Sequence, residues 1–291
     1  MNINSIFHQT NANAASTVNQ SSKAIDPAIR DVKLTLQHIM SFLDFQSVAR
    51  CRIVSRAWKR AVDDIPGLWQ SIIYRELAFG NDKWAQCFGP DVIKDEPVGE
   101  DFASLPWSEV IEDFRNIKKV FPERKATDSL MLVRLPKTLN GGLSINSLGT
   151  LATQHFPANV NGYRNIWANI VQQLGNQSIS ESYWVLMTKD VLPGSRSQSY
   201  PTQQQMVADL AEQSLRGYRV PGTLEAITCI LSQYFDSSMR LFSDKPWTYT
   251  RCLENIGGYQ LIVGGFAPAG LDVIYSYDVS GHVAVASLRK F

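Results

Sequence analysis

The side chains best suited to covalent chemistry in this sequence are those of its cysteines and histidines, and one pair of them could form a catalytic site. Cys252 follows Arg251, and His282 lies further along the same C-terminal part of the chain. A cysteine thiol becomes a nucleophile when a histidine lies beside it in the folded protein. A cysteine in the middle of a strand is otherwise a small buried apolar residue. The sequence leaves open whether Cys252 belongs to a hydrolase-like pair or only packs in the core.

Other kinds of chemistry have little support. The four cysteines are scattered, without the paired spacing of a zinc site or a disulfide framework, and we expect no metal and no cofactor. The glycine pairs Gly257-Gly258 and Gly264-Gly265 do not form a phosphate-binding motif and are interpreted as turns between strands. A net charge of +1 does not favour nucleic acid or an anionic membrane. No run approaches the roughly 18 apolar residues of a membrane span, so we expect a soluble, cytoplasmic protein.

The N-terminal part is expected to contain a polar leader and then short helices. Residues 1–25 contain no Asp or Glu and few large apolar residues, which is typical of a disordered segment and also of bacterial export leaders. Apolar residues from Val32 to Leu43 then repeat at helical spacing. Two further short helices carry Val48 and Trp58, and Pro66-Gly67 ends the third.

This helical region resembles an F-box, the small three-helix domain that binds the Skp-type adaptor of a cullin-RING ubiquitin ligase. The matching elements are Ile39-Met-Ser-Phe-Leu-Asp44, Val48, Val54-Ser-Arg-Ala-Trp58 and Leu68-Trp69, in the order and spacing of the family. The Leu-Pro pair that usually opens an F-box is absent, and Lys33-Leu34 or Thr35-Leu36 stands in its place. The resemblance implies that the following apolar and aromatic residues contact the adaptor: Leu34, Leu36, Ile39, Phe42, Leu43, Val48, Val54, Trp58, Leu68 and Trp69. The alternative is a three-helix connector in which Trp58 and Trp69 pack only its own core.

The rest of the chain is expected to have the α+β class. A helix is predicted over 107–121, where apolar residues repeat at helical spacing until Pro122. Beyond residue 130 helices and strands are mixed, which suggests an antiparallel sheet with helices on one side. The predicted strands are 130–135, 183–187, 249–253, 259–263, 271–277 and 283–288, and the predicted helices are 166–174, 206–215 and 224–234.

The C-terminal part also resembles an uncharacterised domain that accompanies F-boxes in proteins of amoeba-infecting chlamydiae. The similar stretches are 183–196, 241–252 and 263–271. This resemblance implies a bacterial effector that is secreted into the cytoplasm of a eukaryotic host, with the polar leader as its export signal. Two segments that mix aromatic and charged residues are the candidates for binding a target protein, through Lys189, Asp190, Arg196, Trp247 and Arg251.

These observations divide the chain into a leader (1–28), an F-box-like domain (29–77), a helical connector (78–129) and an α+β domain (130–291). The first functional hypothesis is a non-catalytic substrate receptor, which binds the adaptor through its F-box and an unknown protein target through its C-terminal domain. The alternative is an enzyme that uses Cys252 and His282, with the F-box serving localisation or turnover. A third possibility is a globular interaction protein whose helices resemble an F-box by chance.

Overall fold

The computed structural model describes residues 39–40, 43, 47–48, 67–94, 96, 101–214, 216–276 and 280–291. The chain divides into an N-terminal unit, Met1–Leu68, and a C-terminal unit, Trp69–Phe291. The predicted arrangement of three helices in the F-box-like region lies outside the described residues. None of the helices in the described ranges is both long and apolar enough to cross a membrane.

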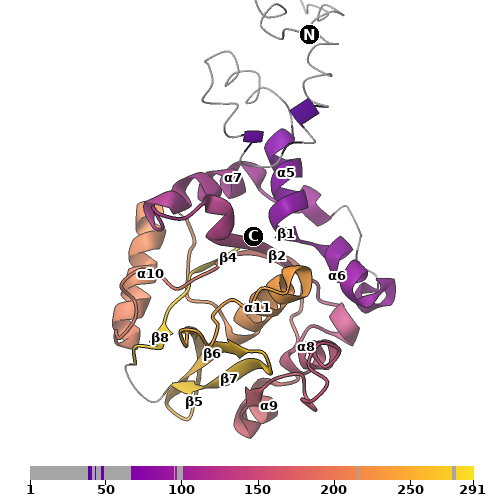
Figure 1. The fold of residues 1–291 in the computed structure, drawn as a ribbon, viewed down its shortest axis with the longest axis vertical. Helices are drawn as coiled ribbons and strands as arrows, with labels where there is room; N and C mark the ends of the chain where they lie inside the picture. Colours follow the sequence, from indigo (N-terminus) through magenta and orange to yellow (C-terminus); the bar gives the residue numbers. More distant parts are fainter. Residues whose placement is uncertain are drawn as a thin grey trace, which may run out of the picture. The chain divides into compact units, whose positions relative to one another are not determined.

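Two mixed β-sheets form the framework of the C-terminal unit (Figure 1). The first sheet has the order β1-β2-β4-β9, with β1 parallel to β2 and the other pairs antiparallel. The second has the order β3-β7-β6-β5-β8, in which the edge strands β3 and β8 are parallel to their neighbours. The strands are β1 (Ala78–Phe79), β2 (Leu130–Leu135), β3 (Asn165–Ile166), β4 (Tyr183–Thr188), β5 (Tyr249–Ile256), β6 (Tyr259–Ala267), β7 (Gly270–Ser276), β8 (Val283–Ala284) and β9 (Leu288–Lys290).

Seven α-helices and five short 3-10 helices accompany these sheets in the described part of the chain. The α-helices are α5 (Leu68–Leu77), α6 (Asn81–Phe88), α7 (Trp107–Asn116), α8 (Ile145–Ala152), α9 (Ala168–Leu174), α10 (Tyr200–Ser214) and α11 (Thr223–Ser237). The 3-10 helices are η1 (Pro90–Ile93), η2 (Asp101–Ser104), η3 (Ile117–Lys119), η4 (Ala126–Asp128) and η5 (Leu139–Gly141). The structure is therefore a mixture of helix and sheet, consistent with the α+β class.

Helix α11 is the centre of the C-terminal unit (Figure 1). It contacts β1 and β2 of the first sheet and β5 and β6 of the second. Every residue from Ala226 to Ser232 is buried, so the helix is covered on all sides instead of presenting one apolar stripe. The sequence predicted this helix but placed helices on one side of a single sheet, and this arrangement is wrong.

The connection from β8 to β9 shows why a single antiparallel sheet was expected. The sequence predicted one strand over 283–288, but β8 pairs with β5 and β9 pairs with β4, which lie in different sheets. The residues between them, Val285 to Ser287, are fully buried and continue the apolar pattern. A run of buried residues has the same sequence pattern whether it stays in one sheet or crosses between two.

A β-bulge inside β6 depends on two glycines. The sequence predicted a turn at Gly264-Gly265, but both residues lie within the strand, at φ +152° and +53°. A Cβ atom on Gly264 would lie 2.3 Å from the Thr248 backbone oxygen, and one on Gly265 would lie 2.3 Å from the Tyr249 hydroxyl. The glycines therefore allow β5 and the loop before it to approach β6 closely.

The segment predicted as a connector contributes to the core of the C-terminal unit. Strand β1 pairs with β2, and the Trp84 side chain is fully buried and donates a hydrogen bond to the Arg134 backbone oxygen at 3.0 Å. The predicted helix over 107–121 is α7 followed by the 3-10 turn η3. The domain boundaries proposed from the sequence remain a prediction.

Candidate functional site

A surface pocket lies between the segment that follows α7 and the loop that follows β4. Its volume is about 500 Å³, within the range typical of small-ligand sites. Phe121, Val191 and Leu192 form a buried apolar floor. The rest of the lining consists of Val120, Pro122, Glu123, Arg124, Asp190, Pro193, Gly194 and Arg196. Asp190 and Arg196, which the sequence marked as candidates, therefore lie at one pocket.

Hydrogen bonds hold the loop 190–197 in place. The Asp190 carboxylate pairs with Arg124 and also accepts from the Val191 amide at 2.7 Å. The Leu192 amide donates to the Val285 carbonyl at 2.8 Å. Ser195, which is fully buried, donates from its hydroxyl to the Leu192 carbonyl at 2.7 Å. The pocket is thus formed by backbone that is already hydrogen-bonded, and a ligand would not have to order it.

Arg196 connects the pocket to a second candidate, Trp247. Its guanidinium donates to the Gly281 carbonyl at 3.1 Å, to the Thr248 hydroxyl at 2.8 Å and to the Trp247 carbonyl at 3.5 Å. Segments that are far apart in the sequence therefore meet around one cation. No local sequence pattern could have indicated this meeting.

The Trp247 side chain is supported by charged and aromatic residues. It is 36% exposed, it stacks parallel to Tyr249 at 6.1 Å between ring centroids, and the Arg164 guanidinium lies 4.6 Å from its ring centroid. Arg164 makes a two-point ion pair with Asp272, which also accepts from the Tyr249 hydroxyl at 3.0 Å. These contacts fix the indole ring at the surface, as required of a rigid aromatic anchor. No local sequence pattern identifies Arg164 and Asp272 as partners, because 108 positions separate them.

Gly265→Ala tests this support. We expect the free energy of unfolding to fall by more than about 1 kcal/mol, because the added methyl would collide with the rings of Tyr249 and Trp247. Gly257→Ala is the matched control, since Gly257 also has a positive φ, +62°, but has open space around its Cα. Urea unfolding followed by circular dichroism measures both variants. Equal losses would show that backbone strain, and not the contact with the rings, determines the effect.

The other two target-binding candidates lie elsewhere. Lys189 is half-buried, and its ammonium donates to the Thr127 carbonyl at 3.0 Å. Burial lowers the pKa of this amine from its usual range. Arg251 is only 6% exposed, and its guanidinium lies 5.9 Å from the centroid of the Tyr200 ring on α10. Neither residue lines the pocket, and a role in target binding stays a prediction for both.

The structure does not assemble the Cys252–His282 pair. Cys252 is fully buried in the core on β5, and burial raises the pKa of its thiol well above the usual range. His282 is exposed, and its Nδ1 atom lies 3.3 Å from the Trp247 carbonyl oxygen. A buried thiol with a raised pKa is neither accessible nor deprotonated near neutral pH. This geometry corresponds to the interpretation of Cys252 as a core residue.

The reactivity of Cys252 can be measured directly. We expect it to resist a maleimide reagent at neutral pH in the folded protein and to react only after unfolding. In the folded protein its thiol is protonated and the reagent cannot reach it. Cys87, which is only partly buried, serves as the internal comparison. Mass spectrometry of peptides after timed labelling gives the rate for each cysteine. Faster modification of Cys252 than of Cys87 in the folded protein would contradict this assignment.

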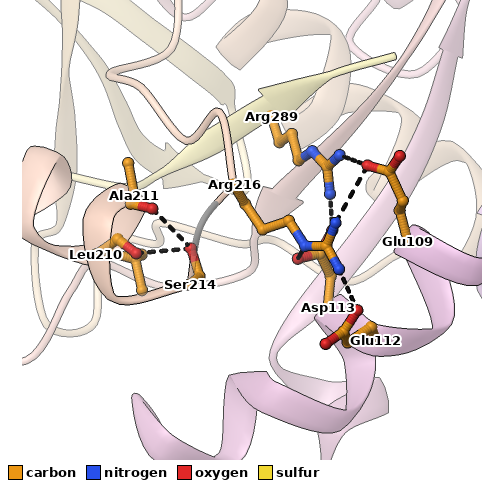
Figure 2. A network of polar contacts seen from close by, with 8 residues as sticks. All are labelled: Glu109, Glu112, Asp113, Leu210, Ala211, Ser214, Arg216 and Arg289. Atoms are coloured by element: carbon orange, nitrogen blue, oxygen red, sulfur yellow. Dashed lines mark hydrogen bonds and ion pairs between the residues drawn. The ribbon is translucent and has the colours of Figure 1, made fainter.

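A dense cluster of charges joins α7 to β9 (Figure 2). The Arg289 guanidinium donates to Asp113 at 2.6 Å and also pairs with Glu109. Arg216 pairs with Glu112 and lies 3.3 Å from Glu109. Burial is the largest influence on the Asp113 carboxyl and raises its pKa, while Arg289 acts in the opposite direction. Each charged side chain of the cluster has a partner of opposite charge within it, so we assign the cluster a structural role.

A second set of acidic residues occupies the start of α11. Glu225 accepts from the Gly222 amide at 2.8 Å and from Arg219 at 2.8 Å. Glu254 accepts from the amide and the hydroxyl of Thr223, each at 2.7 Å. The amide groups that could have bound an anion at this helix end are therefore occupied. Within the described ranges, no group of three His, Cys, Asp or Glu side chains is placed to bind a metal ion.

Half of the predicted adaptor contacts can be located. Leu34, Leu36, Phe42, Val54 and Trp58 lie outside the described residues. Ile39 is 49% exposed, Leu43 is half-buried, and Val48 and Leu68 are buried. Trp69 lies in the first turn of α5. Contact between any of these residues and an adaptor remains a prediction.

Comparison with known protein families identifies the N-terminal region. Residues 35–75 match the F-box-like family. A domain of this family indicates a role in protein–protein interaction, typically with Skp-type adaptors of ubiquitin ligase complexes. No curated protein and no solved structure matches the chain. The resemblance of the C-terminal part to a chlamydial domain therefore has no support from a relative.

Proposed function

We propose that this protein is a non-catalytic substrate receptor of a cullin-RING ubiquitin ligase. Its F-box-like domain binds a Skp-type adaptor, and its C-terminal unit binds a target protein. The match of residues 35–75 to the F-box-like family carries the proposal. A few apolar and aromatic anchors in an adaptor interface supply most of its binding energy, and the region contains such residues in the order of the family. No cofactor takes part.

The pocket beside the loop 190–197, together with the exposed Trp247 ring, is the proposed site for the target. Support comes from the fixed position of the indole ring, the pre-formed pocket and the Arg196 side chain, which lines the pocket and donates to the Trp247 carbonyl. Aromatic residues and arginines are the side chains that most often dominate binding energy at protein interfaces. We also propose a role in target binding for Asp190, which lines the pocket, and for Lys189 and Arg251, which lie outside it.

The resemblance of residues 130–291 to the chlamydial domain leads us to propose where the protein acts. In this view the protein is a bacterial effector that acts in the cytoplasm of a eukaryotic host. The acid-poor composition of residues 1–25 supports an export signal. A reporter fused behind residues 1–28 and expressed in a bacterium with a type III secretion system would appear in the medium, and retention of the reporter would contradict this part.

Binding of the full chain to a purified eukaryotic Skp-type adaptor tests the main proposal. We expect the two proteins to elute together in gel filtration and the adaptor to bridge the chain to a cullin. A folded full-length chain that does not bind the adaptor would overturn the proposal. In that case the function would have to lie in the C-terminal unit alone.

A further inference from the structure

The pocket beside the loop 190–197 combines an apolar floor with charged residues at its rim. Phe121, Val191 and Leu192 are each less than one-tenth exposed, so the floor is formed by packed side chains. Arg124 and Asp190 pair with each other across the rim. A side chain that entered the pocket would therefore contact the apolar floor. At one edge it would lie beside Arg124 and Asp190, whose charges neutralise each other.

Arg196 differs from the other arginines near this surface. Arg124 pairs with Asp190, and Arg164 pairs with Asp272. The Arg196 guanidinium donates only to neutral oxygens, and no carboxylate among the described residues lies within ion-pair distance of it. A half-buried cation without a carboxylate gives this end of the pocket a positive potential. Charge complementarity then favours an anionic group on the partner.

Building on the proposed function, we propose that the pocket binds a short segment of the target protein in which an Asp or Glu side chain lies next to an apolar one. The apolar side chain enters above Phe121 and Leu192. The carboxylate pairs with Arg196, and the exposed Trp247 ring covers the neighbouring residue of the segment. Each contact uses a group that the structure already holds in position.

Other sources of the carboxylate fit less well. Proteins usually bind a C-terminal carboxylate through a nest of free backbone amides, but the amides of Val191, Leu192 and Ser195 already donate to oxygens of the protein. Residues 1–25 of this chain contain no Asp or Glu and so cannot supply the acidic group. An internal acidic side chain of a partner is the remaining source.

Selection from a phage library of random short peptides on the folded full chain tests the proposal. We expect enrichment of peptides that contain an apolar residue within two positions of Asp or Glu. The affinity of an enriched peptide is then measured by fluorescence anisotropy on Arg196→Gln and on Arg240→Gln. Loss of the carboxylate contact should weaken binding at least about tenfold for Arg196→Gln. Arg240 is exposed and does not line the pocket, so its variant should bind as the wild type does.

Arg196 also donates hydrogen bonds to neighbouring loops, so its replacement affects both peptide binding and stability. A second variant separates these two effects. Val120→Trp adds bulk at the pocket wall without changing Arg196 and should also weaken the peptide at least about tenfold. Enrichment of basic peptides, no enrichment, or unchanged affinity in both pocket variants would overturn the proposal. So would self-association of the wild type that Val120→Trp abolishes, because the occupant would then be a second copy. Adaptor binding is measured on the same samples. It shows whether only the peptide-binding proposal fails or whether the proposed receptor function fails as well.

Discussion

Replacing Leu43 and Trp58 together by Ala should weaken binding to a Skp-type adaptor by on the order of a thousandfold. Truncation of one central anchor in a protein interface costs about 2 kcal/mol or more, which is about thirtyfold in affinity. When two independent anchors are truncated, the two factors in affinity multiply. The two residues lie in the two most specific parts of the family motif, Ser-Phe-Leu-Asp and Val-Ser-x-x-Trp. Isothermal titration calorimetry with the full chain gives the dissociation constants.

The chain provides a matched control for this pair. Leu253→Ala with Trp247→Ala removes the same two side-chain types from the C-terminal unit, where they are 44% and 36% exposed. We expect this control to bind the adaptor as the wild type does. Circular dichroism must show that both double variants are folded. If the folded Leu43/Trp58 variant retained wild-type affinity, the anchors would have been assigned to the wrong residues.

Arg289→Met should lower the free energy of unfolding by about 3 kcal/mol or more. Loss of one partner of a buried ion pair typically costs about 3–5 kcal/mol, and Arg216, whose Nε lies 3.9 Å from the Asp113 carboxylate, is too distant to replace the lost hydrogen bond. Arg289 is 8% exposed and Asp113 is 2% exposed, and Arg289 also pairs with Glu109 (Figure 2). Urea unfolding followed by near-ultraviolet circular dichroism measures the loss.

Two further variants isolate the cause. Lys290→Met removes a neighbouring cation whose partner Glu181 is exposed, and we expect little change in stability. Arg289→Met combined with Asp113→Asn should recover part of the lost stability, because the buried charge is also removed. If Arg289→Met and Lys290→Met had equal effects, the cluster that joins α7 to β9 would not stabilise the protein.

The regular elements of the C-terminal unit could be predicted because they have strong local patterns. Strand β2 begins and ends where the sequence predicted, and α11 was recognised from its apolar spacing. The two-residue strands β1 and β3 were missed, and β8 was not separated from β9, since so short a pairing has no periodicity of its own. Their parallel partners come from distant parts of the chain, and only the tertiary fold brings them together.

The candidate site could be predicted only in part, for a similar reason. The mixture of aromatic and charged residues selected the segments of Arg196 and Trp247 separately, and the fold brings the Arg196 guanidinium to 3.5 Å from the Trp247 carbonyl oxygen. Target binding by these residues remains a prediction. The apolar floor at Phe121 was not found, because it comes from the segment after α7. Cys252 was ambiguous because neither its burial nor its distance from His282 can be read from its neighbours in the sequence.

The order of the first sheet has a consequence for how the C-terminal unit folds. Strand β4 pairs with β9, which follows it by about one hundred residues, while the intervening chain forms α10, α11 and most of the second sheet. Pairing over such a separation carries a large loop-closure cost, and sheets of this kind fold slowly. Until β9 docks, the apolar strand β4 presents an open edge to which other chains can add. Because β9 completes the first sheet so late in the chain, we expect the C-terminal unit to fold slowly and fragments that lack β9 to aggregate.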